Sequence, residues 1–402
     1  VPFFYDYPAR AMRVVGITGT NGKTTTSYLV RAILRHAGRR VGLIGTIQAM
    51  IEDEVLPTSN TTPDIIVLQQ MLAEMRTRGM DAVVMEVSSH ALALGRVAGI
   101  EFDTAVFTNL TQDHLDFHKT MENYARAKAH LFELVSAPGA KEGKTAVLNA
   151  DDAASETMRA YTRCPIITYG VDHPADLTAQ DVQLACDGME LTLMHGGKLL
   201  FHLHTGITGL FNVHNVLAAV GASLAEHVAA TDIAAALTAF TGVPGRFELV
   251  REGQDFAVIV DYAHTPDGME NVLRTARAVT KGRIIAVFGC GGDRDRTKRP
   301  IMGRIGAEMA DIAILTSDNP RTEDPAAIVD EVERGVLPVI GDKPYEKIVD
   351  RRTAIFHAIG RAQAGDTVVI LGKGHETYQI LKDGTIHFDD REQAREAIRS
   401  RA

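Results

Sequence analysis

The sequence predicts an α/β fold built on mostly parallel sheets. Short apolar runs alternate with longer amphipathic segments from Met12 to Thr168, which is typical of parallel strands joined by helices. A stretch punctuated by glycine and proline, Thr241–Gly245, precedes a second run of this alternation. Because 402 residues also exceed what one core usually serves, we expect several domains. The expected divisions are a linker at 1–11, a central domain at 12–244 and a C-terminal domain at 245–402.

Composition and charge exclude several classes of protein. The formal net charge of -9 argues against a general nucleic-acid surface, although local basic sites for anionic ligands stay open. No run reaches the roughly 18 apolar residues that span a membrane, and no signal peptide is evident. Cys164, Cys186 and Cys290 are scattered without a metal-spaced pair, which favours reduced thiols. We expect a cytoplasmic, monomeric protein.

The elements of the central domain follow from apolar spacing. Continuous apolar runs, and runs in which apolar and polar residues alternate, predict strands. Apolar residues three and four positions apart predict helices. An alternating stretch around the His195-Gly196-Gly197 turn predicts an antiparallel hairpin. The expected strands are 12–17, 41–46, 81–87 and 102–108, followed by a strand–helix unit at 146–168 and the hairpin at 177–205. The expected helices are 27–36, one beginning near 64, 124–132, 216–226 and 231–240.

A glycine-rich stretch at 16–26, GITGTNGKTTT, separates the first strand from the first helix. Its backbone N–H groups and the following helix N-terminus favour an anion, and Lys23 adds a positive charge. Thr24 stands where a hydroxyl can reach a nucleotide-bound magnesium ion. The spacing departs from the usual P-loop, since Gly16 comes one residue early and Ile17 takes a glycine position. We interpret the stretch as a nucleotide phosphate site.

Polar side chains follow two later strands of the central domain. Glu86 and Ser88 lie at the end of the strand 81–87, and ligand crevices in parallel sheets lie beyond the carboxyl ends of strands. A carboxylate one strand away from a P-loop commonly serves magnesium. The loop after the next strand clusters two aspartates and two histidines, which favours a site: Asp113, His114, Asp116 and His118.

Two further features of the central domain keep alternative interpretations. Thr61 and Thr62 precede Pro63 and a predicted helix, so they could cap that helix or contact a ligand. Lys128 lies in a predicted helix and, from composition alone, is interpreted as a solvated lysine.

The C-terminal domain is expected to be doubly wound. Its predicted strands are 256–261, 283–289, 312–316 and 367–372, and its predicted helices are 267–279, 300–310, 325–335 and 351–364. Polar and glycine residues gather where the strands end, at 261–267, 289–296, 317–321 and 372–376. Four such loops on one sheet edge indicate a binding face. The GCGG run at 289–292 lacks the third glycine of a dinucleotide turn, so that signal is weak.

These residues resemble the motifs of the Mur ligases, the ATP-dependent amide-forming enzymes of peptidoglycan precursor synthesis. The matching runs are TGTNGKTT at 18–25, EVSSH at 86–90, TNL with DHLD at 108–116, and DYAHTP at 261–266. The resemblance covers essentially the whole chain and is strongest for the branch that adds meso-2,6-diaminopimelate. It implies a P-loop ATPase-like central domain with a mostly parallel sheet and a Rossmann-like C-terminal domain. It also implies an ADP-forming acid–amino-acid ligase that works through an acyl phosphate.

The resemblance also implies roles in ATP and magnesium binding. Lys23, Lys128 and His114 would be catalytic, and Lys128 would be carbamylated. Two magnesium ions would be held by Thr24, Glu86, His114 and the Lys128 carbamate. ATP would contact Gly19, Thr20, Asn21, Gly22, Lys23, Thr24, Thr25, Asn215, Arg246 and Asp261.

The substrates implied are UDP-N-acetylmuramoyl-L-alanyl-D-glutamate, the UDP-muramoyl-dipeptide, and meso-diaminopimelate. The dipeptide substrate would contact Thr61, Thr62, Ser88 and Arg96, and Leu94 stands where enterobacterial relatives carry a glutamine. The distal end of diaminopimelate is a zwitterion, which requires an arginine for its carboxylate and carboxylates for its ammonium. The implied acceptor residues are Arg294, Asp318, Asn319, Arg321, Gly372 and Glu376. Without Arg321, the run at 318–320 would be simply a good turn.

Two rival functions stay open. A folylpolyglutamate synthase-like ligase shares the architecture, but its glutamate acceptor lacks the distal ammonium that would pair with Asp318 and Glu376. A catalytically silent nucleotide-binding module is the other rival, and the joint presence of Lys23, Glu86, His114 and Lys128 argues against it. The family ordinarily begins with a domain that holds the uridine nucleotide. We see no such domain in this sequence, and therefore expect weak capture of the UDP-linked substrate.

Overall fold

The computed structural model describes residues 1–56 and 60–401. The chain forms two compact units. Unit 1 comprises Val1–Gln183 and Gly188–Thr241, and unit 2 comprises Leu184–Asp187 and the chain from Gly242. No helix within the described residues is long and apolar enough to cross a membrane.

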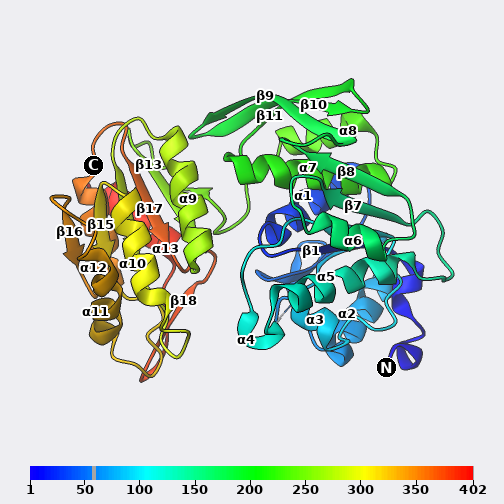
Figure 1. Ribbon diagram of the computed structural model, residues 1–402, viewed down its shortest axis with the longest axis horizontal. Coiled ribbons are helices and arrows are strands. Elements are labelled where there is room, and N and C mark those ends of the chain that lie inside the picture. Colours follow the sequence, from blue (N-terminus) through cyan, green and yellow to red (C-terminus); the bar gives the residue numbers. More distant parts are fainter. Residues whose placement is uncertain (57–59, 402) are drawn as a thin grey trace. The chain divides into compact units, whose positions relative to one another are not determined.

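Unit 1 is built on one large sheet, whose central strands are parallel (Figure 1). Within the described residues the strand order is β11-β10-β9-β8-β7-β6-β1-β5-β2-β3-β4. The strands are β1 Arg13–Thr18, β2 Val41–Ile44, β3 Ala49–Ile51, β4 Glu54–Leu56, β5 Ala82–Glu86, β6 Thr104–Phe107, β7 Thr145–Asn149, β8 Ile166–Gly170, β9 Leu177–Ala185, β10 Gly188–His195 and β11 Lys198–Thr205. The predicted hairpin at 177–205 therefore contains one strand more than expected, because a second turn separates β9 from β10.

Helices cover both faces of this sheet (Figure 1). One group contains α1 Lys23–His36, α7 Leu210–Ala225 and α8 Ala230–Thr238, which contact one another. The other face carries α2 Ile65–Thr77, α3 Ser89–Ala93, α5 Met121–Ser136 and α6 Ser155–Tyr161, with the short α4 at Leu115–His118. The predicted linker forms two short 3-10 helices, Pro2–Tyr5 and Pro8–Ala11.

Strand order explains why three polar loops of unit 1 meet. β1 lies between β5 and β6, with Ile17 opposite Glu86 and Thr18 opposite Phe107. The three strands are parallel, so the loops that follow them leave from the same edge. Gly16 belongs to β1 and not to the phosphate loop, and a Cβ there would lie 2.7 Å from the Phe102 ring. The early glycine thus serves packing, which accounts for the irregular spacing.

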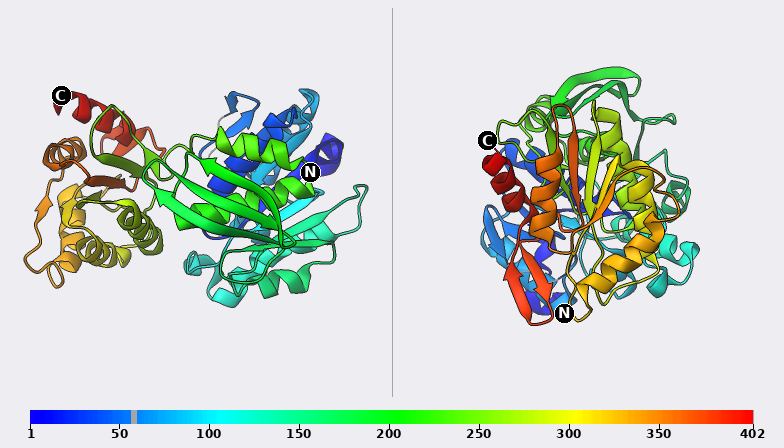
Figure 2. Two further views of the ribbon diagram at one scale, coloured as in Figure 1. Left: turned by 90° about the horizontal axis from the view of Figure 1, so that it is seen from above. Right: turned by 90° about the vertical axis from the view of Figure 1, so that its left-hand side faces the viewer.

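Unit 2 contains a second, smaller sheet in the order β12-β13-β17-β14-β15-β16. Helices α12 and α13 pack on one face, and α9, α10 and α11 form a separate group on the other (Figure 2, right). The strands are β12 Glu248–Leu249, β13 Ala257–Asp261, β14 Ile284–Phe288, β15 Ile312–Leu315, β16 Tyr345–Lys347 and β17 Thr367–Leu371, beside a β18–β19 hairpin at Tyr378–Leu381 and Gly384–His387. The helices are α9 Pro266–Val279, α10 Lys298–Met309, α11 Pro325–Val336, α12 Arg351–Arg361 and α13 Asp390–Arg401.

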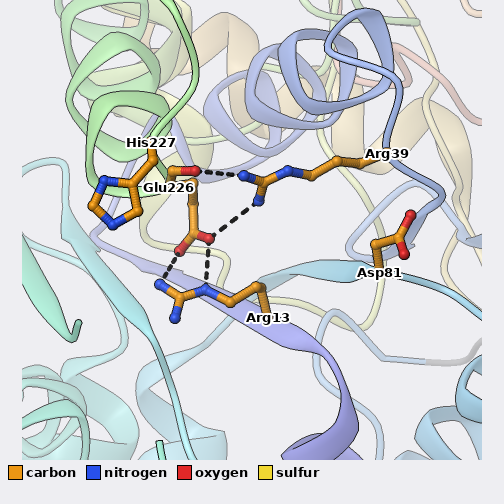
Figure 3. Close-up of a pocket in the computed structure, with 5 residues that line it drawn as sticks. All are labelled: Arg13, Arg39, Asp81, Glu226 and His227. Atoms are coloured by element: carbon orange, nitrogen blue, oxygen red, sulfur yellow. Dashed lines mark hydrogen bonds and ion pairs between the residues drawn. The ribbon is translucent and has the colours of Figure 1, made fainter. Parts of the chain in front are cut away.

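One cavity lies at the end of the unit 1 sheet where β1 begins, away from the polar loops that follow β1, β5 and β6 (Figure 3). It measures about 400 Å³ and is lined by Arg13, Arg39, Asp81, Glu226 and His227. The fully buried Glu226 carboxylate accepts hydrogen bonds from Arg13 Nε at 2.8 Å and Arg39 Nη1 at 3.4 Å. The charged groups of Arg13, Arg39 and Glu226 are thus already paired with one another within the fold.

Candidate functional site

The phosphate loop closes around the Lys23 side chain. Lys23 begins α1, and its Nζ donates to Gly19 O at 2.9 Å and Thr20 O at 2.7 Å. Gly19 has a φ of 150°, and a Cβ there would lie 1.8 Å from Thr108 Oγ1. Gly22 has a φ of 85°, which also favours glycine. The loop therefore keeps a cation at the N-terminus of a helix, an arrangement that suits a phosphate.

Glu86 lies at the centre of a hydroxyl cluster beside this loop. Its side chain is fully buried, and Oε2 accepts from Thr24 Oγ1 at 3.0 Å. Thr46 binds both oxygens, through its backbone N at 2.8 Å from Oε1 and its Oγ1 at 2.9 Å from Oε2. Sequence reasoning missed Thr46. Its only signal was its place at the carboxyl end of a predicted strand beside Glu86.

Lys128 is buried and lies against the phosphate loop. Only 1% of its surface is exposed, and Nζ donates to Gly19 O at 2.7 Å. The ammonium also lies 4.4 Å from the centre of the Tyr124 ring. Burial, followed by the nearby charge of Lys23, holds the pKa of Lys128 well below its usual value. The interpretation as a solvated lysine was wrong.

A signal for this burial existed in the helix itself. In α5, Tyr124, Lys128 and Phe132 recur four residues apart, and all three are buried. A lysine within the apolar stripe of a helix needs a reason other than solubility.

Histidines and aromatic rings gather beyond β6. The ring centroids of His90 and His114 are 4.7 Å apart, and His118 lies 5.0 Å from Tyr124. His118 Nε2 is 2.9 Å from Ser89 Oγ. Burial and the charge of His90 lower the pKa of His118 to about 4, and burial also lowers the pKa of His114. Neutral imidazoles of this kind are available to bind a metal or to accept a hydrogen bond.

The residues expected to contact the muramoyl substrate form one connected group. Thr62 Oγ1 lies 2.9 Å from Glu86 O and 3.0 Å from Ser88 N. Arg96 Nη1 donates to Thr62 O at 3.0 Å, and Thr61 Oγ1 lies 3.0 Å from Thr46 Oγ1. Thr62 does not cap α2, whose N-cap residue is Asp64. The capping alternative for Thr62 was therefore wrong, because its hydroxyl is hydrogen-bonded to Glu86 O and Ser88 N at the end of β5.

Asn215 reaches the phosphate loop from α7. It is buried, and Thr26 Oγ1 donates to its Oδ1 at 3.4 Å. A Cβ on Gly22 would lie 2.4 Å from the same oxygen, so the loop and the amide are close neighbours. The Nδ2 group donates to Asn212 Oδ1 at 2.9 Å.

In unit 2, Asp261 and Arg246 lie together. The buried Asp261 carboxylate accepts from Phe247 N at 2.6 Å and Ala263 N at 2.7 Å. Burial raises the pKa of Asp261, and the positive charge of Arg246 opposes that shift. The Arg246 guanidinium lies 4.8 Å from the centre of the Tyr262 ring.

The expected acceptor residues also gather in unit 2, where β15 and β17 end. Asn319 Nδ2 donates to Glu376 Oε2 at 2.9 Å, and a Cβ on Gly372 would lie 2.4 Å from Asp318 Oδ2. Arg321 Nη1 donates to Gly292 O at 2.8 Å. The Arg294 side chain is exposed, and a Cβ built on Gly291 would lie near both arginines. These residues thus lie together in the loops that follow β14, β15 and β17.

Residues 17–223 match the Mur ligase middle domain, and residues 245–374 match the Mur ligase, glutamate ligase domain. The chain belongs to the Mur ligase family. This Mur ligase is 50% identical over 400 residues to the UDP-N-acetylmuramoyl-L-alanyl-D-glutamate–2,6-diaminopimelate ligase of Bacillus cereus. The alignment covers 99% of the chain and 80% of that relative.

Solved structures agree with this assignment. A UDP-N-acetylmuramoyl-L-alanyl-D-glutamate–2,6-diaminopimelate ligase superposes on this Mur ligase with a TM-score of 0.71 at 37% identity. That superposition covers 97% of this chain and 78% of the other. Mycobacterium tuberculosis folylpolyglutamate synthase complexed with ADP gives a TM-score of 0.75 at 20% identity, over 92% of this chain and 90% of the other. At that identity the second likeness concerns the fold alone.

The hydroxyl and carboxylate oxygens at the phosphate loop of this Mur ligase are of the kind that bind magnesium. Within residues 1–56 and 60–401, no three His, Cys, Asp or Glu side chains gather as a metal site. The hard oxygens of Thr24 and Glu86 nevertheless lie side by side at the phosphate loop. Magnesium in nucleotide sites is commonly bound through one or two such oxygens together with the phosphates. The site therefore suits a metal that arrives with a nucleotide.

Proposed function

We propose that this Mur ligase joins meso-diaminopimelate to the D-glutamyl γ-carboxylate of UDP-N-acetylmuramoyl-L-alanyl-D-glutamate, with hydrolysis of ATP to ADP and phosphate. The observation that carries the proposal is the acceptor cluster of Asp318, Asn319, Arg321 and Glu376 around the ends of β15 and β17. The name of the Bacillus cereus relative, at 50% identity, supports the same acceptor.

We assign the proposed ATP contacts to both units. Unit 1 would be the P-loop ATP-binding domain, with the phosphates at Gly19–Thr25 and Asn215 toward the base. Unit 2 would be a Rossmann-like domain that holds the amino acid, with Arg246 and Asp261 contributing to ATP. The two domains would divide near residues 244 and 245.

The chemistry assigned to unit 1 is transfer of the ATP γ-phosphoryl group to the D-glutamyl carboxylate. Lys23 would bind the phosphates, and Thr61, Thr62, Ser88 and Arg96 would orient the muramoyl peptide. Magnesium, held by Thr24, Glu86, His114 and a carbamate on Lys128, would supply neutralisation of the phosphate charge. Because phosphoryl transfer needs little covalent help, positioning and charge supply most of the rate.

The acceptor amine would then attack the acyl phosphate, and the tetrahedral adduct would lose phosphate to leave the amide. The distal carboxylate of diaminopimelate suits the guanidinium groups of Arg321 and Arg294, and its distal ammonium suits Asp318 and Glu376. A glutamate acceptor would leave these carboxylates without an ammonium.

The test compares acceptors in a phosphate-release assay with ATP, magnesium and UDP-muramoyl-dipeptide. We expect release that depends on meso-diaminopimelate and is far slower with lysine or glutamate. Faster release with lysine would overturn the acceptor assignment, and preference for glutamate would favour a folylpolyglutamate synthase-like ligase. ATP binding without release for any acceptor would identify a silent nucleotide-binding protein.

We further propose that Lys128 carries a carbamate, which the low pKa of its amine favours because only the neutral amine reacts with carbon dioxide. The N–C bond forms with loss of one proton and leaves a buried anion beside Lys23. We expect a carbamate signal in carbon-13 NMR after addition of labelled bicarbonate. Activity should fall as the pH is lowered or carbon dioxide is removed, and bicarbonate should restore it.

The controls separate this carbamate from other lysine adducts. Lys128→Met should lose the signal, whereas Lys119→Met, which alters an exposed lysine between α4 and α5, should keep it. An unchanged signal in Lys128→Met would rule the proposal out.

A further inference from the structure

Lys373 lies beneath the acceptor cluster without access to solvent. It follows β17, and its side chain has 0% exposure. Nζ lies 3.1 Å from Glu376 Oε2 and 3.1 Å from Asn319 Oδ1. A lysine is almost never fully buried unless its charge is paired, so both contacts are needed to hold it there.

Asn319 and Glu376 are hydrogen-bonded to each other as well as to Lys373. Asn319 Oδ1 accepts from Lys373 Nζ and from Ile380 N at 2.9 Å, so two donors define which end of the amide is the oxygen. The Nδ2 group is thereby turned to Glu376 Oε2, at 2.9 Å. The three side chains form a closed triangle that joins the loops after β15 and β17.

Neighbouring groups keep this triangle in place from both sides. Gln379 Nε2 donates to Asp318 O at 2.7 Å, so the backbone that leads into Asn319 is also fixed. The Lys373 ammonium lies 5.5 Å from the centre of the Tyr378 ring. Burial and then the charge of Glu376 raise the pKa of Tyr378.

We propose that Lys373 is a positioning residue for the acceptor. It cannot touch the acceptor, because it is enclosed, and it acts by setting the orientation of the Asn319 amide and the Glu376 carboxylate. The ligand served is an amino acid whose far end carries both an ammonium and a carboxylate. This inference rests on the proposed function, since it assigns the same cluster to the acceptor.

The test measures KM for each substrate in Lys373→Met, with Lys382→Met as a control at an exposed lysine in the turn of the β18–β19 hairpin. Loss of a charged hydrogen bond predicts a KM for meso-diaminopimelate raised about tenfold to a hundredfold. The KM for ATP and for UDP-muramoyl-dipeptide should stay within about twofold of wild type. Lys373→Gln, which keeps donors without the charge, should give an intermediate KM and serves if the methionine variant fails to fold.

A double-mutant cycle with Glu376→Gln distinguishes positioning from general damage. If Lys373 acts through Glu376, its substitution should have much less effect on the acceptor KM in the Glu376→Gln background. Equal increases in the KM of all three substrates, or additive effects of the two substitutions, would overturn the proposal. Failure of the proposed function is a separate result, since wild type would then show no release dependent on diaminopimelate.

Discussion

Replacing Lys23 with methionine is expected to lower acceptor-dependent phosphate release about a thousandfold, because a cation that stabilises transferring phosphate charge is worth that order of magnitude. The Lys23 ammonium is held by Gly19 O and Thr20 O at the start of α1, which fixes it at the helix N-terminus. Lys128, a second lysine beside this loop, is enclosed and cannot replace the Lys23 ammonium.

The same substitution should leave the fold intact. In the protein without the Lys128 carbamate, Lys23 and Lys128 both donate to Gly19 O, and the charge of Lys23 disfavours a charged Lys128, so removal of Lys23 relieves that interaction. The pKa of Lys128 should rise toward its usual value, because one of the causes that lowers it is the charge of Lys23. Melting temperature and phosphate release are the two measurements needed.

A matched control is available on the β11 strand. Lys198→Met removes an exposed lysine of the same unit and should leave the rate of release unchanged. A loss of less than about tenfold in Lys23→Met would contradict a phosphate role, since charged hydrogen bonds normally cost more than this.

Replacing Arg351 with methionine should destabilise unit 2 by about 3–5 kcal/mol, the usual cost of leaving one partner of a buried ion pair. Arg351 and Asp390 have 0% side-chain exposure, and the guanidinium donates to both carboxylate oxygens, at 2.7 and 2.6 Å. Arg351 also donates to Ser317 O and Leu371 O, which precede the acceptor residues Asp318 and Gly372.

Because the chain has two units, the loss should be measured by hydrogen exchange of unit 2 segments and not from one global transition. The neighbouring Arg352→Met removes an exposed ion pair with Glu396 and should leave exchange nearly unchanged. Arg351→Met combined with Asp390→Leu should recover much of the stability, since an apolar pair can replace a buried ionic one. Equal changes in hydrogen exchange in Arg351→Met and Arg352→Met would contradict the stabilising role of the Arg351–Asp390 pair.

The local pattern of the sequence was sufficient to predict most of the parallel strands and the helices between them in both units, but not β3, β4, β12, β16, α13 or the β18–β19 hairpin. The spacing of apolar residues is a local feature of the sequence, and it predicted the bounds of β1, α9 and α12 to within a few residues. The polar loops after β1, β5 and β6 were also predictable as a group, because parallel strands send their exits to one edge. The roles assigned within those loops stay predictions.

The tertiary structure alone decided what each polar side chain meets. Lys128 is buried against Gly19, which is 109 residues away, and Lys373 pairs with Asn319, which is 54 residues away. Thr46 binds Glu86 across the sheet, and Gly16 makes room for Phe102. A local pattern can indicate the buried face of a helix, but hydrogen-bond partners depend on residues that only folding brings together. Local sequence features were enough to predict the fold class, the phosphate loop with Lys23 and the ends of the strands where polar loops gather, whereas the burial of Lys128 and Lys373 results from packing between distant segments.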